Sequence, residues 1–194
     1  MKLNNFISVF LQTSPIFFTV YIFLGGLIAS NYYFILYGIF AYLNLIINKI
    51  LKYIAKFIYN KFDIKSLPII GLGVRPKGAV NCSAIPYQKG YITKSKSFGM
   101  PSGHSQNAWF LFGFMLLYLI NNYKNEKNDT MEKFLFGLKI SVLFIIALSI
   151  SISRVYINCH TVQQVIIGGI IGLIIGCLAY LLTKYIVEKI EKRK

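Results

Sequence analysis

Long apolar stretches that carry almost no charge constrain the fold of this chain more than any other feature. They cover residues 6–29, 32–47, 105–120, 134–152 and 165–187. Helices of about 20 apolar residues match the thickness of a bilayer core. Only 14% of the residues are charged, against about a quarter in soluble domains. We therefore predict an all-α integral membrane helical bundle with about five transmembrane helices, formed by residues 1–194 as a single domain.

Two local features of these stretches can each be interpreted in two ways. Pro15 either kinks one helix or begins a helix after a short interfacial segment. We interpret this first stretch as a span and not as a cleaved signal peptide, because Gly25-Gly26 lies inside it and no small-residue cleavage site follows. In the last stretch, glycines recur at every fourth position from 168 to 176. They indicate either a close helix contact or the general abundance of glycine in membrane helices.

The charge balance indicates an anionic partner. There are 21 Lys+Arg against 6 Asp+Glu, a net charge of +15, which suits nucleic acid or phosphate-bearing lipid. The cations gather at the ends of the apolar stretches and no nucleic-acid recognition module is visible. We therefore predict the bilayer and a lipid phosphate as partners, and no nucleic acid. Lys49, Lys52 and Lys56 recur at helical spacing, as an amphipathic extension of the second span or as lysines that snorkel at the membrane edge.

Five spans fix a relative topology. The polar segment 60–104 and the short segment 153–160 lie on one face, and residues 121–132 and the tail 188–194 lie on the other. Both histidines, His104 and His160, therefore lie on one face. Lys and Arg are dense on both faces, so the positive-inside rule does not assign sidedness.

Three polar clusters on the histidine face suit a phosphate. Arg75 and Arg154 carry planar guanidinium groups that match phosphate oxygens in pairs, and Lys77 adds a point charge. Ser102 and Gly103 open the third span, where free backbone N–H groups and the helix dipole favour an anion. The hydroxyl of Ser102 suits a phosphate oxygen, although a plain helix N-cap is the commoner role of such a serine.

The two histidines suggest a division of labour. One imidazole is suited to attack phosphorus and carry the phosphoryl group. The other is suited to protonate the leaving oxygen, because its pKa lies near neutral pH. A lone histidine is usually structural, but here both lie beside arginine-containing motifs on one face. We favour the catalytic interpretation for that reason.

These motifs resemble the type 2 phosphatidic acid phosphatase (PAP2) superfamily, which includes membrane lipid phosphatases and vanadium haloperoxidases. The resemblance rests on Arg75-Pro76, on residues 100–106 (Met-Pro-Ser-Gly-His-Ser-Gln) and on Ser153-Arg154 followed by His160, and it covers residues 44–172. It implies that His160 is the nucleophile and His104 the acid. It also implies that the motif arginines and serine, here Arg75, Arg154 and Ser102, bind phosphate.

Within the superfamily, the flanking residues are most similar to the dolichyl-diphosphatase branch. The similar positions are Phe98-Gly99 before the central motif, Trp109-Phe110 after it, and Thr161 with Gln163-Gln164-Val165 after His160. The apolar spans suit a lipid enzyme better than a haloperoxidase.

The chain departs from the superfamily pattern at two positions. The family usually has a lysine six residues before Arg-Pro, where this chain has Pro68. We expect Lys52 to replace it, with Lys65 as the weaker candidate.

The second departure is Gln164, which stands where an acid usually follows the nucleophile. Of the 6 carboxylates, only Asp63 shares the face of the histidines. We expect the amide oxygen of Gln164 to accept from His160 and orient it without adding charge. The rival interpretation is an inactivated relative.

The same shortage of carboxylates argues against a metal ion. Mg²⁺ and Ca²⁺ sites use carboxylates, and structural Zn²⁺ sites use Cys and His sets. We expect metal-independent hydrolysis with no cofactor. Of the three cysteines, Cys82 and Cys159 lie on the histidine face. We expect them to be free buried thiols, with a disulfide as the second interpretation if that face is lumenal.

The sequence as a whole predicts a membrane lipid phosphatase. We expect it to hydrolyse a phosphate from a polyprenyl (dolichyl-type) diphosphate through a phosphohistidine. Phosphatidic acid or another glycerolipid phosphate is the second substrate class. The sequence is also compatible with a phosphoryl transferase, or with a weakened or non-catalytic relative that binds lipid phosphate. For localisation we expect a multi-pass protein of the endoplasmic reticulum membrane, with the catalytic face lumenal.

Overall fold

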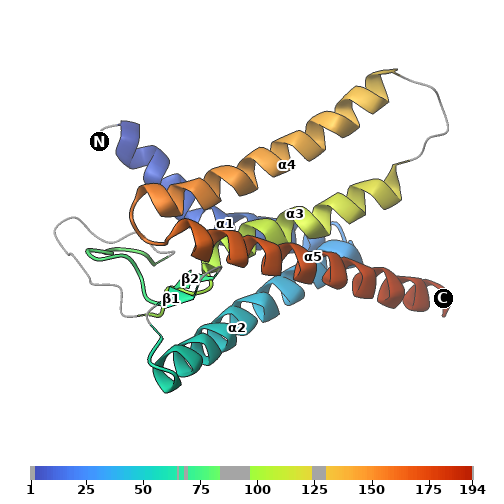
Figure 1. Ribbon diagram of the computed structural model, residues 1–194. Helices are drawn as coiled ribbons and strands as arrows, with labels where there is room; N and C mark the ends of the chain where they lie inside the picture. The colour runs from blue at the N-terminus through green and yellow to red at the C-terminus, as the bar shows by residue number, and fades with distance from the viewer. Residues whose placement is uncertain (1–2, 65, 68–69, 84–96, 124–129, 194) are drawn as a thin grey trace.

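The computed structural model describes residues 3–64, 66–67, 70–83, 97–123 and 130–193. Its five helices are α1 (Leu3–Ile28), α2 (Tyr32–Lys61), α3 (Gly103–Asn122), α4 (Thr130–Tyr156) and α5 (Val162–Glu191). Two short strands, β1 (Ser66–Leu67) and β2 (Gly71–Leu72), pair antiparallel, with Ser66 opposite Leu72. Figure 1 shows the hairpin at the end of the bundle where α3 begins and α4 ends. The all-α membrane bundle with five helices is confirmed, and the hairpin is an addition that the sequence did not indicate.

Four of the five helices are long and apolar enough to span a membrane: α1 from Val9, α2, α4 and α5. The remaining helix, α3, has 20 residues, a length of about 30 Å. It is the only helix that packs against all four others within the described residues. Its polar first turn is therefore surrounded by protein.

Pro15 lies inside α1, which continues through it as one helix. A proline has no N–H to donate to the carbonyl four residues earlier. Here that carbonyl, on Leu11, accepts the hydroxyl of Ser14 at 3.2 Å instead. The interpretation in which a helix begins at Pro15 is wrong.

The recurring glycines of α5 lie against the backbone of α3. A methyl group at Gly172 would collide with the carbonyl oxygen of Gln106, and one at Gly176 with that of Phe110. At Gly168 it would meet the backbone of Ser102. Helix contact, and not general abundance, explains these glycines. The contact also holds the start of α3 against the start of α5.

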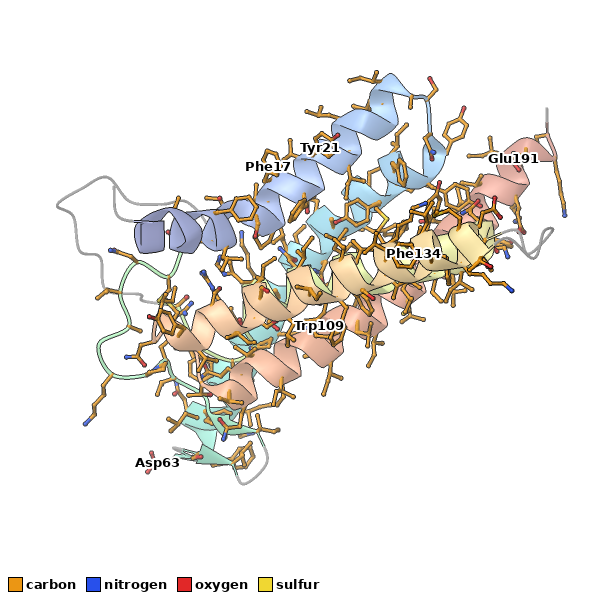
Figure 2. All side chains as sticks on the ribbon, turned by 90° about the horizontal axis from the view of Figure 1, so that it is seen from above. Phe17, Tyr21, Asp63, Trp109, Phe134 and Glu191 are labelled. Carbon is orange, nitrogen blue, oxygen red and sulfur yellow. A yellow bond between two sulfur atoms is a disulfide. The ribbon has the colours of Figure 1, made fainter. Side chains whose placement is uncertain are left out.

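The topology matches the expected one. Figure 1 shows the segment after α2 and the turn between α4 and α5 at one end, and the C-terminus at the other. An aromatic core that includes Tyr37, Phe114 and Tyr180 is buried between the helices. In Figure 2, Phe17 and Tyr21 lie on the outer side of α1; they are 59% and 69% exposed. Such large exposed apolar side chains suit a helix that faces lipid.

Candidate active site

His160 lies in the turn between α4 and α5 and is only 2% exposed. Its backbone N–H donates to the carbonyl of Arg154 at 3.1 Å. Its Nδ1 lies 3.0 Å from Oε1 of Gln164, and its Nε2 lies 2.9 Å from Nη1 of Arg75. Because an arginine N–H can only donate, Nε2 carries the lone pair and Nδ1 carries the proton. The ring is thus held with its unprotonated nitrogen toward Arg75.

The contacts of Gln164 explain why this position has an amide, where the family usually has an acid. Its Nε2 donates to the carbonyls of Leu72 and Val74, each at 2.7 Å. Its Oε1 accepts from His160 and, at 3.3 Å, from the N–H of Thr161. A carboxylate has no N–H to offer the two carbonyls. Gln164 therefore joins β2 and the segment after it to the histidine turn.

Arg75 lies between His160 and the segment before α3. Its Nη1 also donates to the carbonyl of Cys159 at 2.8 Å. Its Nε and Nη2 donate to the carbonyl and hydroxyl of Ser97, at 3.1 and 2.8 Å. Burial lowers the pKa of Arg75 to about 10, so the guanidinium stays charged at neutral pH. Burial first, and then the positive charge of Arg75, lowers the pKa of His160 to about 2, which keeps its imidazole neutral.

Arg154 and Ser102 supply donors that the rest of the described residues do not use. Both are fully buried, and Nε of Arg154 donates to the hydroxyl of Ser153 at 3.1 Å. Among the described residues, no group pairs with Nη1 or Nη2 of Arg154 or with the hydroxyl of Ser102. Buried donors without acceptors are costly, and this set matches an oxyanion.

Ser102 occupies the N-cap position of α3, but its side chain makes no capping hydrogen bond. The plain N-cap interpretation of its hydroxyl is therefore wrong. Its backbone N–H donates to the carbonyl of Gln164 at 3.0 Å. This bond ties the start of α3 to the residue that holds His160.

His104 lies in the first turn of α3 and contacts α1, which the sequence did not indicate. Its Nε2 donates to the carbonyl of Gln12 at 3.2 Å. The side-chain amide of Gln12 donates in turn to the carbonyls of Asn81, at 3.0 Å, and Ser83. The apolar stretch around Gln12 gives no sign of this role, because the partners are backbone carbonyls. The first helix is thus part of the site.

The remaining candidates have different surroundings. Nζ of Lys52 donates to the carbonyls of Phe98 and Gly99, at 2.8 and 3.3 Å, so it lies beside the central motif. Lys65 falls outside the described residues. Lys77 is exposed, and it contacts Asn158 through its backbone oxygen at 3.0 Å. Gly103 leaves room for the amide of Asn48, which a methyl group would approach to 2.9 Å.

A buried amide network that supports the site was not predicted. Gln106 accepts from Nδ2 of Asn48 and donates to Oδ1 of Asn44, both at 2.7 Å. Asn44 donates to Asn107 at 2.5 Å. Because α2 supplies the two asparagines, the network fixes Lys52, on the same helix, relative to α3.

Cys82 and Cys159 form a disulfide, so the expectation of free thiols is wrong. A sequence separation of 77 residues gives no sign of the pairing, which depends on how the segment after β2 folds back over the histidine turn. Cys159 directly precedes His160. The bond therefore joins the Arg75 segment to the turn that carries His160.

Among the residues that the structure describes, carboxylates do not gather at the site. Asp63 is exposed just beyond α2, and Glu191 lies at the other end of the bundle (Figure 2). Across the described ranges, no three His, Cys, Asp or Glu side chains come together as a metal ion would require.

Comparison with known proteins places the chain in a family. The model of the PAP2 superfamily matches residues 36–188, and the chain belongs to this superfamily. The matched region contains both histidines and both site arginines.

Among curated proteins, the chain is similar to dolichyldiphosphatase 1 of Homo sapiens, with 33% identity over 100 residues. That match covers 50% of this chain and 41% of the relative. The phosphatidylglycerophosphatase B of Bacillus subtilis is 31% identical over 102 residues, 52% of this chain and 45% of the relative. The matches thus span less than half the length of these relatives.

The fold also matches a crystal structure. It is that of a transmembrane PAP2-type phosphatidylglycerolphosphate phosphatase from Bacillus subtilis, with a TM-score of 0.58 and 21% identity. The match covers 98% of this chain and 79% of that chain. It supports the arrangement of the helices.

Proposed function

We propose that this protein is a lipid phosphatase that hydrolyses the terminal phosphate of a polyprenyl (dolichyl-type) diphosphate. One observation carries the proposal. The neutral Nε2 of His160 is held at 2.9 Å from Arg75, beside buried donors of Arg154 and Ser102 that have no partner among the described residues. A nucleophile next to donors for three phosphate oxygens suits phosphoryl transfer.

The first step forms a phosphohistidine. The Nε2 lone pair of His160 attacks the terminal phosphorus, and the bond from phosphorus to the bridging oxygen breaks. The bridging oxygen keeps the electron pair and takes a proton from His104. Arg75, Arg154, Ser102 and the backbone at Gly103 hold the phosphoryl oxygens, while Lys52 adds positive charge.

The second step releases inorganic phosphate. His104, now neutral, takes a proton from water as the water oxygen attacks phosphorus. The nitrogen–phosphorus bond breaks and its electron pair returns to Nε2 of His160. Gln164 holds Nδ1 throughout and keeps the ring oriented. The positive charges of Arg154, Arg75 and Lys52 oppose a positive charge on His104. A bound phosphate dianion offsets these charges and favours the protonated form of His104.

The similarity to dolichyldiphosphatases supports the polyprenyl diphosphate as substrate. It also supports the endoplasmic reticulum as the location, and the Cys82–Cys159 disulfide supports a lumenal catalytic face.

Lys77 contributes only weakly to phosphate binding in this proposal, because its side chain is exposed.

The test is release of inorganic phosphate from dolichyl diphosphate in detergent with EDTA present. We expect the native protein to release phosphate and His160→Ala to release none. Loss of activity in EDTA that Mg²⁺ restores would contradict the metal-independent mechanism. Equal release by both proteins would contradict the role of His160.

A glycerolipid phosphate is the second candidate substrate, supported by the similarity to phosphatidylglycerophosphatase B. The same assay with phosphatidic acid and phosphatidylglycerophosphate separates the two. We expect kcat/KM to be higher for the polyprenyl diphosphate. A higher value for either glycerolipid would reverse the assignment.

A further inference from the structure

A second cluster of positive charge lies beside the site. A cavity of about 830 Å³ opens between α2 and the segment that carries Arg75. Four cations line it: Lys49, Lys52, Lys56 and Arg75. The lining contains no carboxylate among the described residues. A concave surface with charge of one sign concentrates anions of the opposite sign.

Two of the four cations belong to both the cavity and the site. Arg75 lies 2.9 Å from Nε2 of His160, and Lys52 is bonded to the carbonyls of Phe98 and Gly99. Lys49 and Lys56 lie three residues before and four residues after Lys52, on the same face of α2. The positive charge therefore continues from the nucleophile along α2.

The proposed steps of hydrolysis do not involve Lys49 or Lys56. Both are exposed, and within the described residues neither pairs with a carboxylate. A monoester would be held by the groups at His160, and its leaving group would be an uncharged alcohol. A diphosphate carries a second phosphate one bridging oxygen away, and this phosphate stays on the leaving group.

We propose that Lys49 and Lys56 form a subsite for the second phosphate of a diphosphate substrate and make the enzyme selective for diphosphates over monophosphates. The inference rests on the proposed function. When the terminal phosphorus–oxygen bond breaks, the leaving polyprenyl monophosphate carries negative charge. The two ammonium groups stabilise that charge in the substrate and in the leaving group. Tyr53, 77% exposed, lies in the lining of the same cavity and offers an aromatic ring to the start of the prenyl tail.

The test compares a polyprenyl diphosphate with the monophosphate of the same chain length. The double variant Lys49→Gln/Lys56→Gln removes the charge and keeps polar side chains of similar length. We expect it to lower kcat/KM for the diphosphate about tenfold more than for the monophosphate. The double variant Lys49→Arg/Lys56→Arg keeps both positive charges, and we expect it to keep the preference for the diphosphate. The control is Lys61→Gln, which removes one charge from the end of the same helix outside the cavity lining and leaves the ratio unchanged. Equal losses on both substrates, or none, would overturn the subsite.

A binding measurement keeps this inference separate from the hydrolysis. Inorganic pyrophosphate is expected to raise the Tm of the native protein more than orthophosphate does, and the double variant to lose that difference. No turnover of any lipid phosphate by the native protein would contradict the proposed function alone. A native protein that responds equally to the two anions would overturn the subsite.

Discussion

At the scale of single residues, the proposed chemistry depends on a neutral His160. Burial and the neighbouring Arg75 hold its pKa at about 2, whereas an ordinary histidine titrates near 6.5. A lowered pKa means that the free base persists as the pH falls. The lone pair that attacks phosphorus in the proposed mechanism is therefore present across the physiological range, before any anion binds.

We predict that the His160 imidazole of the free protein does not titrate between pH about 5 and 8. NMR of labelled histidine measures this directly, and His160→Gln assigns the signal because the chain has only two histidines. Arg75→Gln removes the positive charge and is expected to raise the pKa of His160. A midpoint near the ordinary value in the native protein would contradict this account.

Gln164 carries the second residue-scale prediction. Gln164→Glu keeps the size of the side chain but sets a carboxylate against the carbonyls of Leu72 and Val74. We expect a loss of about 1–3 kcal/mol in unfolding free energy for the unsatisfied groups, measured by thermal or denaturant unfolding in detergent. Gln163→Glu, at the exposed neighbouring position, is the matched control. A variant at 164 as stable as this control would show that the carbonyl contacts do not matter.

The motif residues were predictable from the sequence, but the hydrogen bonds that hold them in position were not. His104, His160, Arg75, Arg154 and Ser102 stand in motifs with fixed spacing. Gln12 and the amide of Gln164 instead bond to backbone carbonyls of residues 69 to 92 positions away. A backbone carbonyl has no side-chain identity, so no sequence pattern marks it. The disulfide was only the second interpretation for a different reason: whether Cys82 meets Cys159 depends on the path of the segment after β2.

At the scale of elements, the contact between α3 and α5 positions the site. The glycines of α5 let the backbone of α3 approach, and this brings Ser102 to Gln164. The helices were predictable because their apolar stretches are long. The β1–β2 hairpin was not, because strands of two residues leave almost no pattern.

We predict that Gly172→Ala lowers the unfolding free energy by about 1–3 kcal/mol, because the added methyl group meets the Gln106 carbonyl. Gly137→Ala, in α4, is the control. A methyl group there meets nothing within 4 Å, and alanine favours a helix interior by about 0.5–1 kcal/mol. Unfolding in detergent should separate the two. Equal stabilities would contradict the close contact.

At the scale of the whole molecule, the disulfide joins the Arg75 segment to the turn that carries His160. Disulfides persist on the oxidising side of a membrane. The bond therefore favours a catalytic end that faces a lumenal or extracellular compartment. The opposite end carries the C-terminal tail.

We predict that Cys82→Ser lowers the unfolding free energy by about 2–4 kcal/mol and reduces phosphatase activity. Cys177, a free cysteine in α5, provides the control Cys177→Ser, which should change neither. Thermal unfolding and phosphate release measure both effects. Full thiol labelling of Cys82 and Cys159 in the membrane-embedded protein would contradict the proposed lumenal or extracellular orientation of the catalytic end.

Trapping the covalent intermediate tests the proposed role of His160 most directly. The native protein is mixed with a polyprenyl diphosphate labelled at its terminal phosphate, quenched within one turnover, and digested for mass spectrometry. We predict an acid-labile phosphoryl group on His160, and none in His160→Gln. Turnover without any label on the protein, or a label on a different residue, would contradict the mechanism.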